Sequence, residues 1–238
     1  MNSAAALRRL IKAARTRGAR WARIVDIVRL LRTAEGRAVQ WTWLVHRSTV
    51  HQTTSKTAED RYPDLFDFVA KLRPDAARIL SFGCSTGEEL ASLRARFPSA
   101  EIVGAEINPR SRRIARRRVE SDERTKVIPP GQVDGTFDIV FALAVLQREP
   151  LSVLETGCTD LSDRYSYSQF DRAVSELVAL LQPGGLFCVI HSHYRVEDSS
   201  AIAALQPIPS SMRVRHTYFG PDGLKLANAT SSTVFRKL

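Results

Sequence analysis

Short apolar runs that end in turn residues recur along this chain from about residue 78 onward. Runs of this length predict strands, and they lie at 78–83, 101–107, 125–128, 137–143 and 186–190. Apolar residues at helical spacing lie between them, at about 87–97, after Asn108-Pro109 and at about 169–181. A helix near 198–206 and an antiparallel pair near 213–219 and 232–237 follow. The alternation predicts an α/β fold with a doubly wound, mostly parallel sheet of seven strands and Rossmann-like order.

The first fifty residues have a different pattern. From Ala4 to about Thr33, apolar residues recur at three- and four-residue steps, which predicts an amphipathic helix. Residues 1–50 hold about eleven Lys and Arg against two acids, so this segment carries most of the net charge of +10. We therefore predict a basic helical arm at 1–50 and an α/β domain at 51–238.

A basic amphipathic helix has several uses. Its apolar face packs on the core in the simplest case, and its arginines are then only solvated. Alternatively, residues 1–33 bind an anionic membrane surface, contact nucleic acid, or act as an organelle transit peptide. We favour packing first and the membrane second, with nucleic acid less favoured.

Composition restricts the class of protein further. The chain has 238 residues, 44% hydrophobic and 25% charged, which suits a globular domain with an appendage. No apolar run has the length of about eighteen residues that a membrane span needs, and no secretory signal is visible. The three cysteines are widely spaced without a C-x-x-C pair, which argues against a disulfide framework and a zinc site. We expect a cytoplasmic protein, peripheral to the membrane if the arm binds lipid, with no metal.

The segment from Arg78 to Leu90 carries the most informative motif. An apolar strand enters a turn with Gly83 and Gly87, which lets the backbone approach a ligand closely. The next strand ends at Glu106, about twenty residues further on, where a carboxylate binds ribose hydroxyls in nucleotide sites. Glu88 and Glu89 open the helix and would repel a pyrophosphate, but they suit the ammonium and sulfonium groups of S-adenosylmethionine.

This motif resembles motif I of the class I S-adenosylmethionine-dependent methyltransferases, and Pro183-Gly-Gly185 before a strand is their second signature. The stretch from Ser81 to Glu89 is similar to the variant found in chemotaxis receptor glutamate methyltransferases. The chain departs from these enzymes around Ala142-Leu143-Ala144, where they present an Asn, and it lacks their receptor-docking insertion. The resemblance and the motif together imply a set of cofactor contacts: Arg61, Tyr62, Gly83, Cys84, Ser85, Gly87, Glu88, Glu106, Ile107, Ala142 and Leu143.

Segments around this motif complete the predicted site. Arg61 is placed to pair with the methionyl carboxylate of the cofactor, although an ordinary surface arginine fits equally well. Gln132 and Asp134 are weak candidates for the adenine amino group. The polar stretch 147–168 is long for a connection in a compact domain, so we expect a lid over the substrate.

The strand at 186–190 delivers His191, His193, Tyr194 and Arg195 to its carboxyl end. His193 has the chemistry of a general base near neutral pH, and His191 shares its strand face if the strand continues that far. Tyr194 or Arg195 are alternatives that position an anionic substrate. Polar residues that merely close a strand are the ordinary alternative, and the H-x-H pair lacks a third metal ligand.

The sequence thus predicts methyl transfer to an oxygen or carboxylate of a small-molecule, lipid-linked or carbohydrate-linked acceptor. The alternatives are a catalytically silent regulator that grips a membrane or partner through the arm, and a protein-carboxyl or RNA methyltransferase.

Overall fold

The structure is a computed structural model and describes residues 32–46, 50–52, 57–210, 212, 214 and 216–238. Most of the predicted basic arm therefore lies outside the described residues. The strands are β1 Arg78–Phe82, β2 Glu101–Ala105, β3 Thr125–Ile128, β4 Phe137–Leu143, β5 Leu181–Ile190, β6 Leu205–Pro207 and β7 Val234–Lys237. The α-helices are α2 Ala34–Val45, α3 Pro63–Leu72, α4 Glu88–Arg96, α5 Pro109–Arg118, α6 Pro150–Glu155 and α7 Tyr167–Ala179. Three short 3-10 helices are η1 Pro130–Gln132, η2 Val196–Asp198 and η3 Ser200–Ala204.

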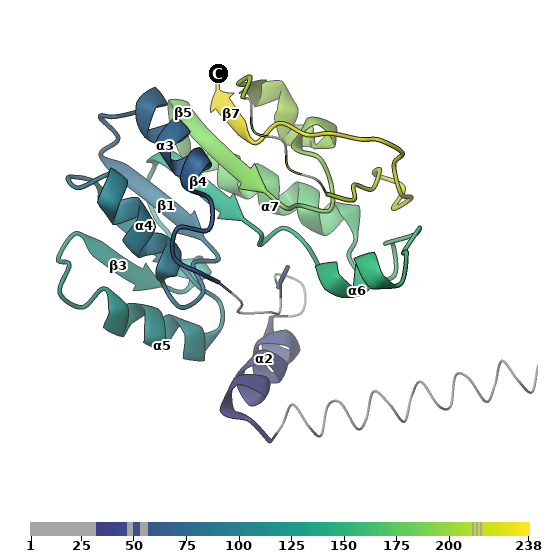
Figure 1. Ribbon diagram of the computed structural model, residues 1–238, viewed down its shortest axis with the longest axis horizontal. Coiled ribbons are helices and arrows are strands. Elements are labelled where there is room, and N and C mark those ends of the chain that lie inside the picture. The colour runs from purple at the N-terminus through teal and green to yellow at the C-terminus, as the bar shows by residue number, and fades with distance from the viewer. Residues whose placement is uncertain (1–31, 47–49, 53–56, 211, 213, 215) are drawn as a thin grey trace, which may run out of the picture.

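These strands form one seven-stranded sheet in the order β3-β2-β1-β4-β5-β7-β6 (Figure 1). The strands β1 to β5 pair in parallel, whereas β7 is antiparallel to both β5 and β6. The mostly parallel, seven-stranded sheet predicted from the sequence is confirmed. The strand order reverses between β1 and β4, and ligands of open α/β sheets bind at the carboxyl ends of strands beside such a reversal.

The last part of the sheet differs from the prediction. The strand β7 lies within the expected 232–237, but its edge partner is β6 at 205–207 and not the expected strand near 213–219. The expected helix near 198–206 is reduced to the short η3. Pro207 and Pro209 follow it, and a residue before proline favours extended backbone, so the chain leaves the helix at Leu205. Residues 216–219 form only isolated bridges at Phe219.

Alternation along the strands gives the sheet two apolar faces. Ile79 of β1 packs with α3 and α4 on one face, whereas its neighbour Leu80 packs with α7 on the other. All seven residues of β4 are buried, as expected of a central strand covered on both sides. Asp138 is the polar exception, and its carboxylate accepts the amide N–H groups of Ala77 and Arg78, both at 2.9 Å. This carboxylate secures the start of β1 to β4 at the edge opposite the ligand site.

The helix α2 lies apart from the layered core, below the carboxyl edge of the sheet in Figure 1. It includes Trp41 and lies within the predicted arm, and Thr33 caps it by accepting the N–H of Gly36 at 2.9 Å. Residues 50–52 then tie this N-terminal element to the predicted lid. The carbonyl of Val50 accepts from Arg148 and from Gln169 of α7, the latter at 2.9 Å.

The predicted lid at 147–168 contains the short helix α6, and α7 begins at Tyr167. None of the helices in the described part of the chain is long and apolar enough to cross a membrane.

Candidate active site

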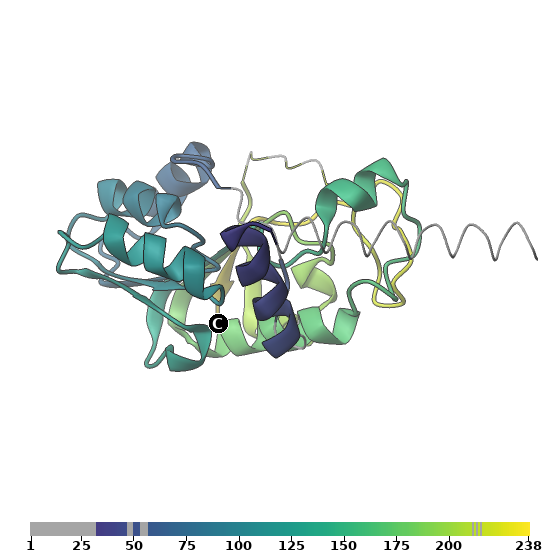
Figure 2. The same cartoon turned by 90° about the horizontal axis from the view of Figure 1, so that it is seen from below.

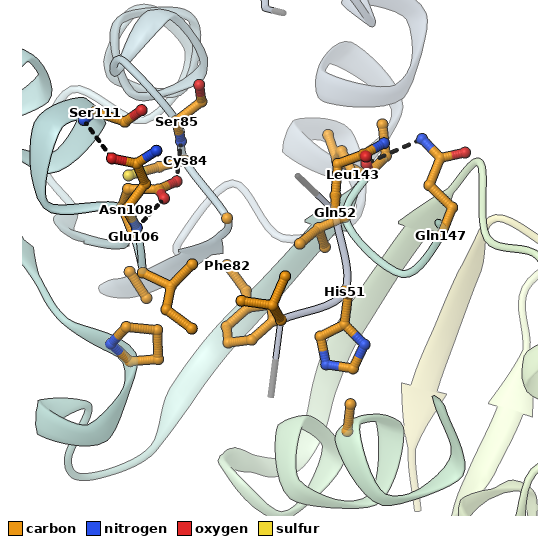
Figure 3. Close-up of a pocket in the computed structure, with 18 of the residues that line it drawn as sticks. His51, Gln52, Phe82, Cys84, Ser85, Glu106, Asn108, Ser111, Leu143 and Gln147 are labelled. Carbon is orange, nitrogen blue, oxygen red and sulfur yellow. Dashed lines mark hydrogen bonds between the residues drawn. The ribbon is translucent and has the colours of Figure 1, made fainter. Parts of the chain in front are cut away.

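A cavity of about 1690 Å³ opens at the carboxyl ends of β1, β2, β4 and β5. The helices α2, α6 and α7 and the segment before α3 supply the remaining walls. Typical pockets for a single small ligand measure about 300–1,000 Å³. The cavity therefore has room for two ligands side by side. Figure 3 shows part of its lining, with Glu106 and Ser85 at one end and His51 and Gln147 toward the other.

The turn after β1 forms one wall of the cavity. Gly83 has a φ of +78°, which favours glycine, and its N–H donates to the carbonyl of Ala105 at 2.8 Å. A Cβ at Gly83 would lie 2.6 Å from Cγ2 of Val145. Gly87, with a φ of +92°, does not line the cavity, and its missing Cβ lets α4 approach Ala115 of α5. The two glycines of the motif thus serve different purposes.

We expect Gly83→Ala to destabilise the fold by about 1–3 kcal/mol more than Gly184→Ala, because overpacking against the stiff side chain of Val145 adds to the strain of a positive φ. Gly184 is a matched control, with a φ of +75° and no heavy atom within 4 Å of an added Cβ. Urea unfolding of both variants measures the difference, and Val145→Ala in the Gly83→Ala background should recover part of it. Equal losses in the two single variants would contradict the close approach seen here.

Glu106 follows β2 and points into the cavity (Figure 3). Its Oε2 accepts the N–H of Ser85 at 2.8 Å and its Oε1 accepts the N–H of Asn108 at 2.6 Å. Burial raises the pKa of this carboxyl, while these two N–H donors act in the opposite direction. Because a carboxylate has about four lone-pair sites, both oxygens keep acceptor capacity for a ligand diol.

The structure separates the two glutamates that open α4. Glu88 accepts from the hydroxyl of Thr86 and pairs with Arg118 at 2.8 Å, so it does not line the cavity. Glu89 does line it, and its carboxyl accepts the hydroxyl of Ser81 at 2.7 Å. Consecutive helical residues point about 100° apart, which is why only one of the pair faces the ligand side. The sequence named Glu88 as a cofactor contact, whereas the structure turns Glu89 toward the cavity.

Burial raises the pKa of Glu89 to about 7, opposed by the Ser81 hydroxyl and the positive charge of Arg61. An unfolded glutamate has its pKa near 4.5. The native state therefore holds a proton that the unfolded chain has lost between these two values. The contribution of Glu89 to the free energy of unfolding is therefore fully present below pH 4.5. It falls as the pH rises to about 7 and does not change further above that value.

We expect this fall to amount to on the order of 3 kcal/mol, at about 1.4 kcal/mol per pKa unit. Urea unfolding between pH 4.5 and 8 should show that Glu89→Gln lacks this part of the slope. Comparing the two proteins cancels the contributions of all other groups. Parallel curves for wild type and variant would show that Glu89 titrates normally.

Arg61 and Tyr62 line the cavity next to Glu89, as the sequence suggested. The guanidinium of Arg61 lies 5.2 Å from the centroid of the Tyr62 ring. The Tyr62 hydroxyl is buried and has no hydrogen-bond partner among the described residues, and burial raises its pKa to about 12. This corner therefore offers a cation and an unoccupied hydroxyl.

The wall below β2 and β3 is formed by Ile107 and by residues 129–133, which include Gln132. Asp134, the other adenine candidate, instead lies outside and approaches Arg78 at 3.5 Å with a largely exposed side chain.

The ends of β4 and β5 supply the opposite wall. Cys84 and Leu143 line the cavity, whereas Ala142 is fully buried in the sheet. His191 and His193 also line it, although β5 ends at Ile190, so they do not share a strand face as the two-residue spacing predicted. Tyr194 does not, because its hydroxyl donates to the carbonyl of Tyr165 at 2.5 Å inside the core.

Arg195, the remaining sequence candidate on this segment, is bound to Asp198 at 2.5 and 2.7 Å and does not line the cavity.

A hydrogen bond fixes the tautomer of His193. Its Nε2–H donates to the carbonyl of Arg148 at 2.8 Å, so Nδ1 carries the lone pair. That Nδ1 is buried without a partner among the described residues. Burial lowers the pKa of His193, which keeps the imidazole neutral at pH 7. Such a nitrogen can accept a proton from a ligand hydroxyl.

His216 lies against His193, with ring centroids 5.4 Å apart, and it also lines the cavity. Sequence reasoning missed this residue, because it belongs to a segment that was expected to be an ordinary edge strand. Burial and the neighbouring histidines lower the pKa of His216 to about 3. Within the part of the chain that the structure describes, no group of three or more His, Cys, Asp or Glu is arranged to hold a metal ion.

Comparisons with known proteins agree with the architecture. The family described as "Methyltransferase domain" matches residues 55–228. The trans-aconitate 2-methyltransferase of Variovorax paradoxus is 26% identical over 152 residues, covering 60% of this chain and 52% of that protein. The demethylmenaquinone methyltransferase of Thermus thermophilus is 29% identical over 123 residues, covering 48% and 46%. This chain thus spans about half the length of the curated relatives it matches.

Among solved structures, S-adenosylmethionine-bound CalS10, an amino pentose methyltransferase from Micromonospora echinaspora, is 29% identical with a TM-score of 0.40. The match covers 56% of this chain and 50% of CalS10.

Proposed function

We propose that this chain, which belongs to the methyltransferase domain family, transfers the methyl group of S-adenosylmethionine to an oxygen of a small-molecule, lipid-linked or carbohydrate-linked acceptor. One observation carries this proposal. The turn at Gly83 and the carboxylate of Glu106 share a single cavity with the unpartnered Nδ1 of His193. The names of the two curated relatives, for trans-aconitate and demethylmenaquinone, support a small-molecule acceptor.

The residues present suit this cofactor. Glu106 has acceptor capacity for the two ribose hydroxyls, and Gly83 leaves free the space that a Cβ would take. Glu89 would receive the ammonium group and Arg61 the carboxylate of the methionyl part. The adenine would lie against Ile107 and residues 129–133. Motif I alone supports the finer resemblance to chemotaxis receptor glutamate methyltransferases, and we do not extend it to their substrate.

S-adenosylmethionine supplies an electrophilic methyl group that leaves its sulfur for the acceptor oxygen, and the sulfonium thereby becomes a neutral thioether. His193 takes the hydroxyl proton at Nδ1, and the Arg148 carbonyl continues to accept from its Nε2–H and stabilises the imidazolium. A carboxylate acceptor would need no base. The apolar side chains of Val153 and Leu177 in the cavity wall help to exclude water from the reaction.

Two measurements test this function. Calorimetry should show that the intact chain binds S-adenosylmethionine, and an assay for S-adenosylhomocysteine should detect turnover with a broad acceptor panel. Absence of cofactor binding would refute the proposal. Binding without turnover over the whole panel would favour the alternative of a catalytically silent regulator.

We also propose that the protein works at an anionic membrane surface. The helices α2 and α6 expose large apolar side chains, with Trp41 and Leu151 60% accessible and Leu44 and Leu154 70%. Trp41, Leu151 and Leu154 also line the cavity, so this apolar surface surrounds its mouth. The helix α5, which neighbours α2, adds exposed arginines at 110, 113 and 117. Figure 2 looks onto the side of the molecule on which α2 and α5 lie. Trp, Leu and Arg together are typical of interfacial helices, and the basic residues 1–33 would add to this attraction.

We expect the double variant Trp41→Ser/Leu44→Ser to bind vesicles of phosphatidylcholine and phosphatidylglycerol about tenfold more weakly in a sedimentation assay, because less apolar surface enters the interface. Leu224→Ser is the matched control, since this leucine is 51% exposed but lies outside these helices. Added salt and removal of residues 1–31 should weaken binding further. Equal binding to vesicles of phosphatidylcholine alone would contradict the electrostatic part of the proposal.

A further inference from the structure

Of the five buried side-chain polar atoms without a hydrogen-bond partner among the described residues, four belong to residues that line the cavity; the fifth is Nε of Arg148, which does not line it. The four are the Tyr62 hydroxyl, Oε1 of Gln147, Nδ1 of His193 and Nε2 of His216. An unsatisfied buried polar atom costs about 1–3 kcal/mol, so native proteins hold few of them. Their gathering at one cavity indicates that a polar ligand completes their hydrogen bonds.

Three of these residues form a connected wall, although they come from distant parts of the chain. The ring of Tyr62 lies 5.9 Å from that of His191, and His191 lies 5.4 Å from His216. His216 in turn lies 5.4 Å from His193. The wall thus runs from Tyr62, a predicted cofactor contact, to His193, the predicted base. An acceptor that approaches the methyl group would pass along it.

The hydrogen-bonding roles of two of the groups are fixed by bonds that they already make. The Nε2–H of His193 donates to Arg148, so its Nδ1 can only accept. The amide nitrogen of Gln147 donates to the carbonyl of Ala144 at 3.0 Å, so its Oε1 can only accept. The Tyr62 hydroxyl and the ring nitrogen of His216 can donate or accept. A ligand must therefore bring at least two donors, and hydroxyl groups satisfy all four partners.

The four groups are also uncharged near neutral pH. Burial lowers the pKa of both His193 and His216 and raises that of Tyr62, and glutamine does not titrate. A cationic acceptor would find no carboxylate among them. An anionic acceptor would find no cation among them either, since the proposed function assigns the nearby Arg61 to the cofactor.

We propose that Tyr62, Gln147, His193 and His216 form the acceptor subsite, and that the acceptor is an uncharged molecule with at least two hydroxyl groups. His216 is then a binding and specificity residue for this acceptor. This inference rests on the proposed function, because it identifies the substrate class of the same cavity.

Two sets of matched probes test the class. One set is glucose, glucosamine and glucuronate, and the other is catechol, dopamine and 3,4-dihydroxybenzoate. Within each set the hydroxyl pattern is largely shared, while the charge is neutral, positive or negative. In at least one set, the neutral member should give S-adenosylhomocysteine at least about tenfold faster than its charged relatives, since a charge left unpaired in a buried site costs more than about 1.4 kcal/mol.

The role of His216 is tested by two variants with the preferred probe. His216→Phe keeps a ring and removes the nitrogen, so it should raise KM about tenfold while the Kd for S-adenosylmethionine stays unchanged. His216→Gln keeps a polar group and should recover part of the loss, which a packing role would not produce.

Preference for a charged member would overturn the inference, as would normal KM in His216→Phe. Turnover of an acceptor from the broad panel, without turnover of any of these probes, would also overturn it. Failure to bind S-adenosylmethionine at all would instead refute the proposed function, so the two failures are distinguishable.

Discussion

Replacing Glu106 by glutamine should weaken the binding of S-adenosylmethionine by about 30- to 150-fold, or about 2–3 kcal/mol. The loss has two sources. The ribose diol would donate to a neutral amide instead of a carboxylate, and hydrogen bonds to charged groups are the stronger ones. In addition, the new NH₂ group would face the N–H of Ser85 or Asn108, both of which Glu106 now satisfies.

Calorimetry on wild type and Glu106→Gln measures this effect, and Glu101→Gln provides a matched control. Glu101 starts the same strand, β2, and pairs with Arg78 and Lys126 far from the cavity. We expect that control to bind the cofactor like wild type. Thermal unfolding should show that both variants remain folded at the assay temperature. Unchanged affinity in folded Glu106→Gln would remove the observation on which the proposed function depends.

The core of the fold could be predicted from the sequence because local pattern determines it. The limits of β4 agree with the apolar run 137–143, and Asn108-Pro109 opens α5 as the capping pattern predicted, with Oδ1 of Asn108 accepting the N–H groups of Arg110 and Ser111. The position of Glu106 at the end of β2 followed from strand length and the preceding glycines. Each of these features depends on residues that are close together in the sequence.

The structure differs from the sequence predictions where the rotation of a helix or long-range packing determines which side chains face the cavity. The sequence favoured Glu88, whereas Glu89 faces the cavity, because the rotation of α4 depends on the left-handed conformation of Gly87, which sequence spacing does not reveal. Tyr194 lies beyond the end of β5 at Ile190, and its hydroxyl donates to the carbonyl of Tyr165 inside the core, a contact that local spacing does not reveal. His216 reaches the cavity through a segment with no regular structure of its own, and no local pattern predicted its contact with His193.

The structure separates the candidate catalytic residues from one another more clearly than the candidate cofactor contacts. The sequence predicted His193 as the base, with His191 beside it and Tyr194 as an alternative that positions substrate, and hydrogen bonds now distinguish them. His193 presents a lone pair of defined position, while the hydroxyl of Tyr194 is committed to the Tyr165 carbonyl. His191, with a φ of +56°, lies between Tyr62 and His216 and serves the wall of the subsite.

His193→Gln should therefore lower kcat by about 10²- to 10⁴-fold with a hydroxyl acceptor, the range that general bases contribute. The glutamine amide can still donate to the Arg148 carbonyl, but no basic nitrogen remains at Nδ1. Cofactor affinity should not change, because Glu106 and the Gly83 turn are untouched. Tyr194→Phe is the comparison: it should cost about 1 kcal/mol of stability through the lost hydrogen bond and leave kcat close to that of wild type.

The pH profile gives an independent check of the same role. A base must be neutral to act, and burial lowers the pKa of His193 below 6.5. Wild-type kcat should therefore stay constant as the pH falls to 6.5 and decline only below that value, whereas His193→Gln should lack this acid limb. Retention of both kcat and the acid limb in the variant would show that the acceptor reacts without a base, as a carboxylate does, and would redirect both the mechanism and the acceptor class.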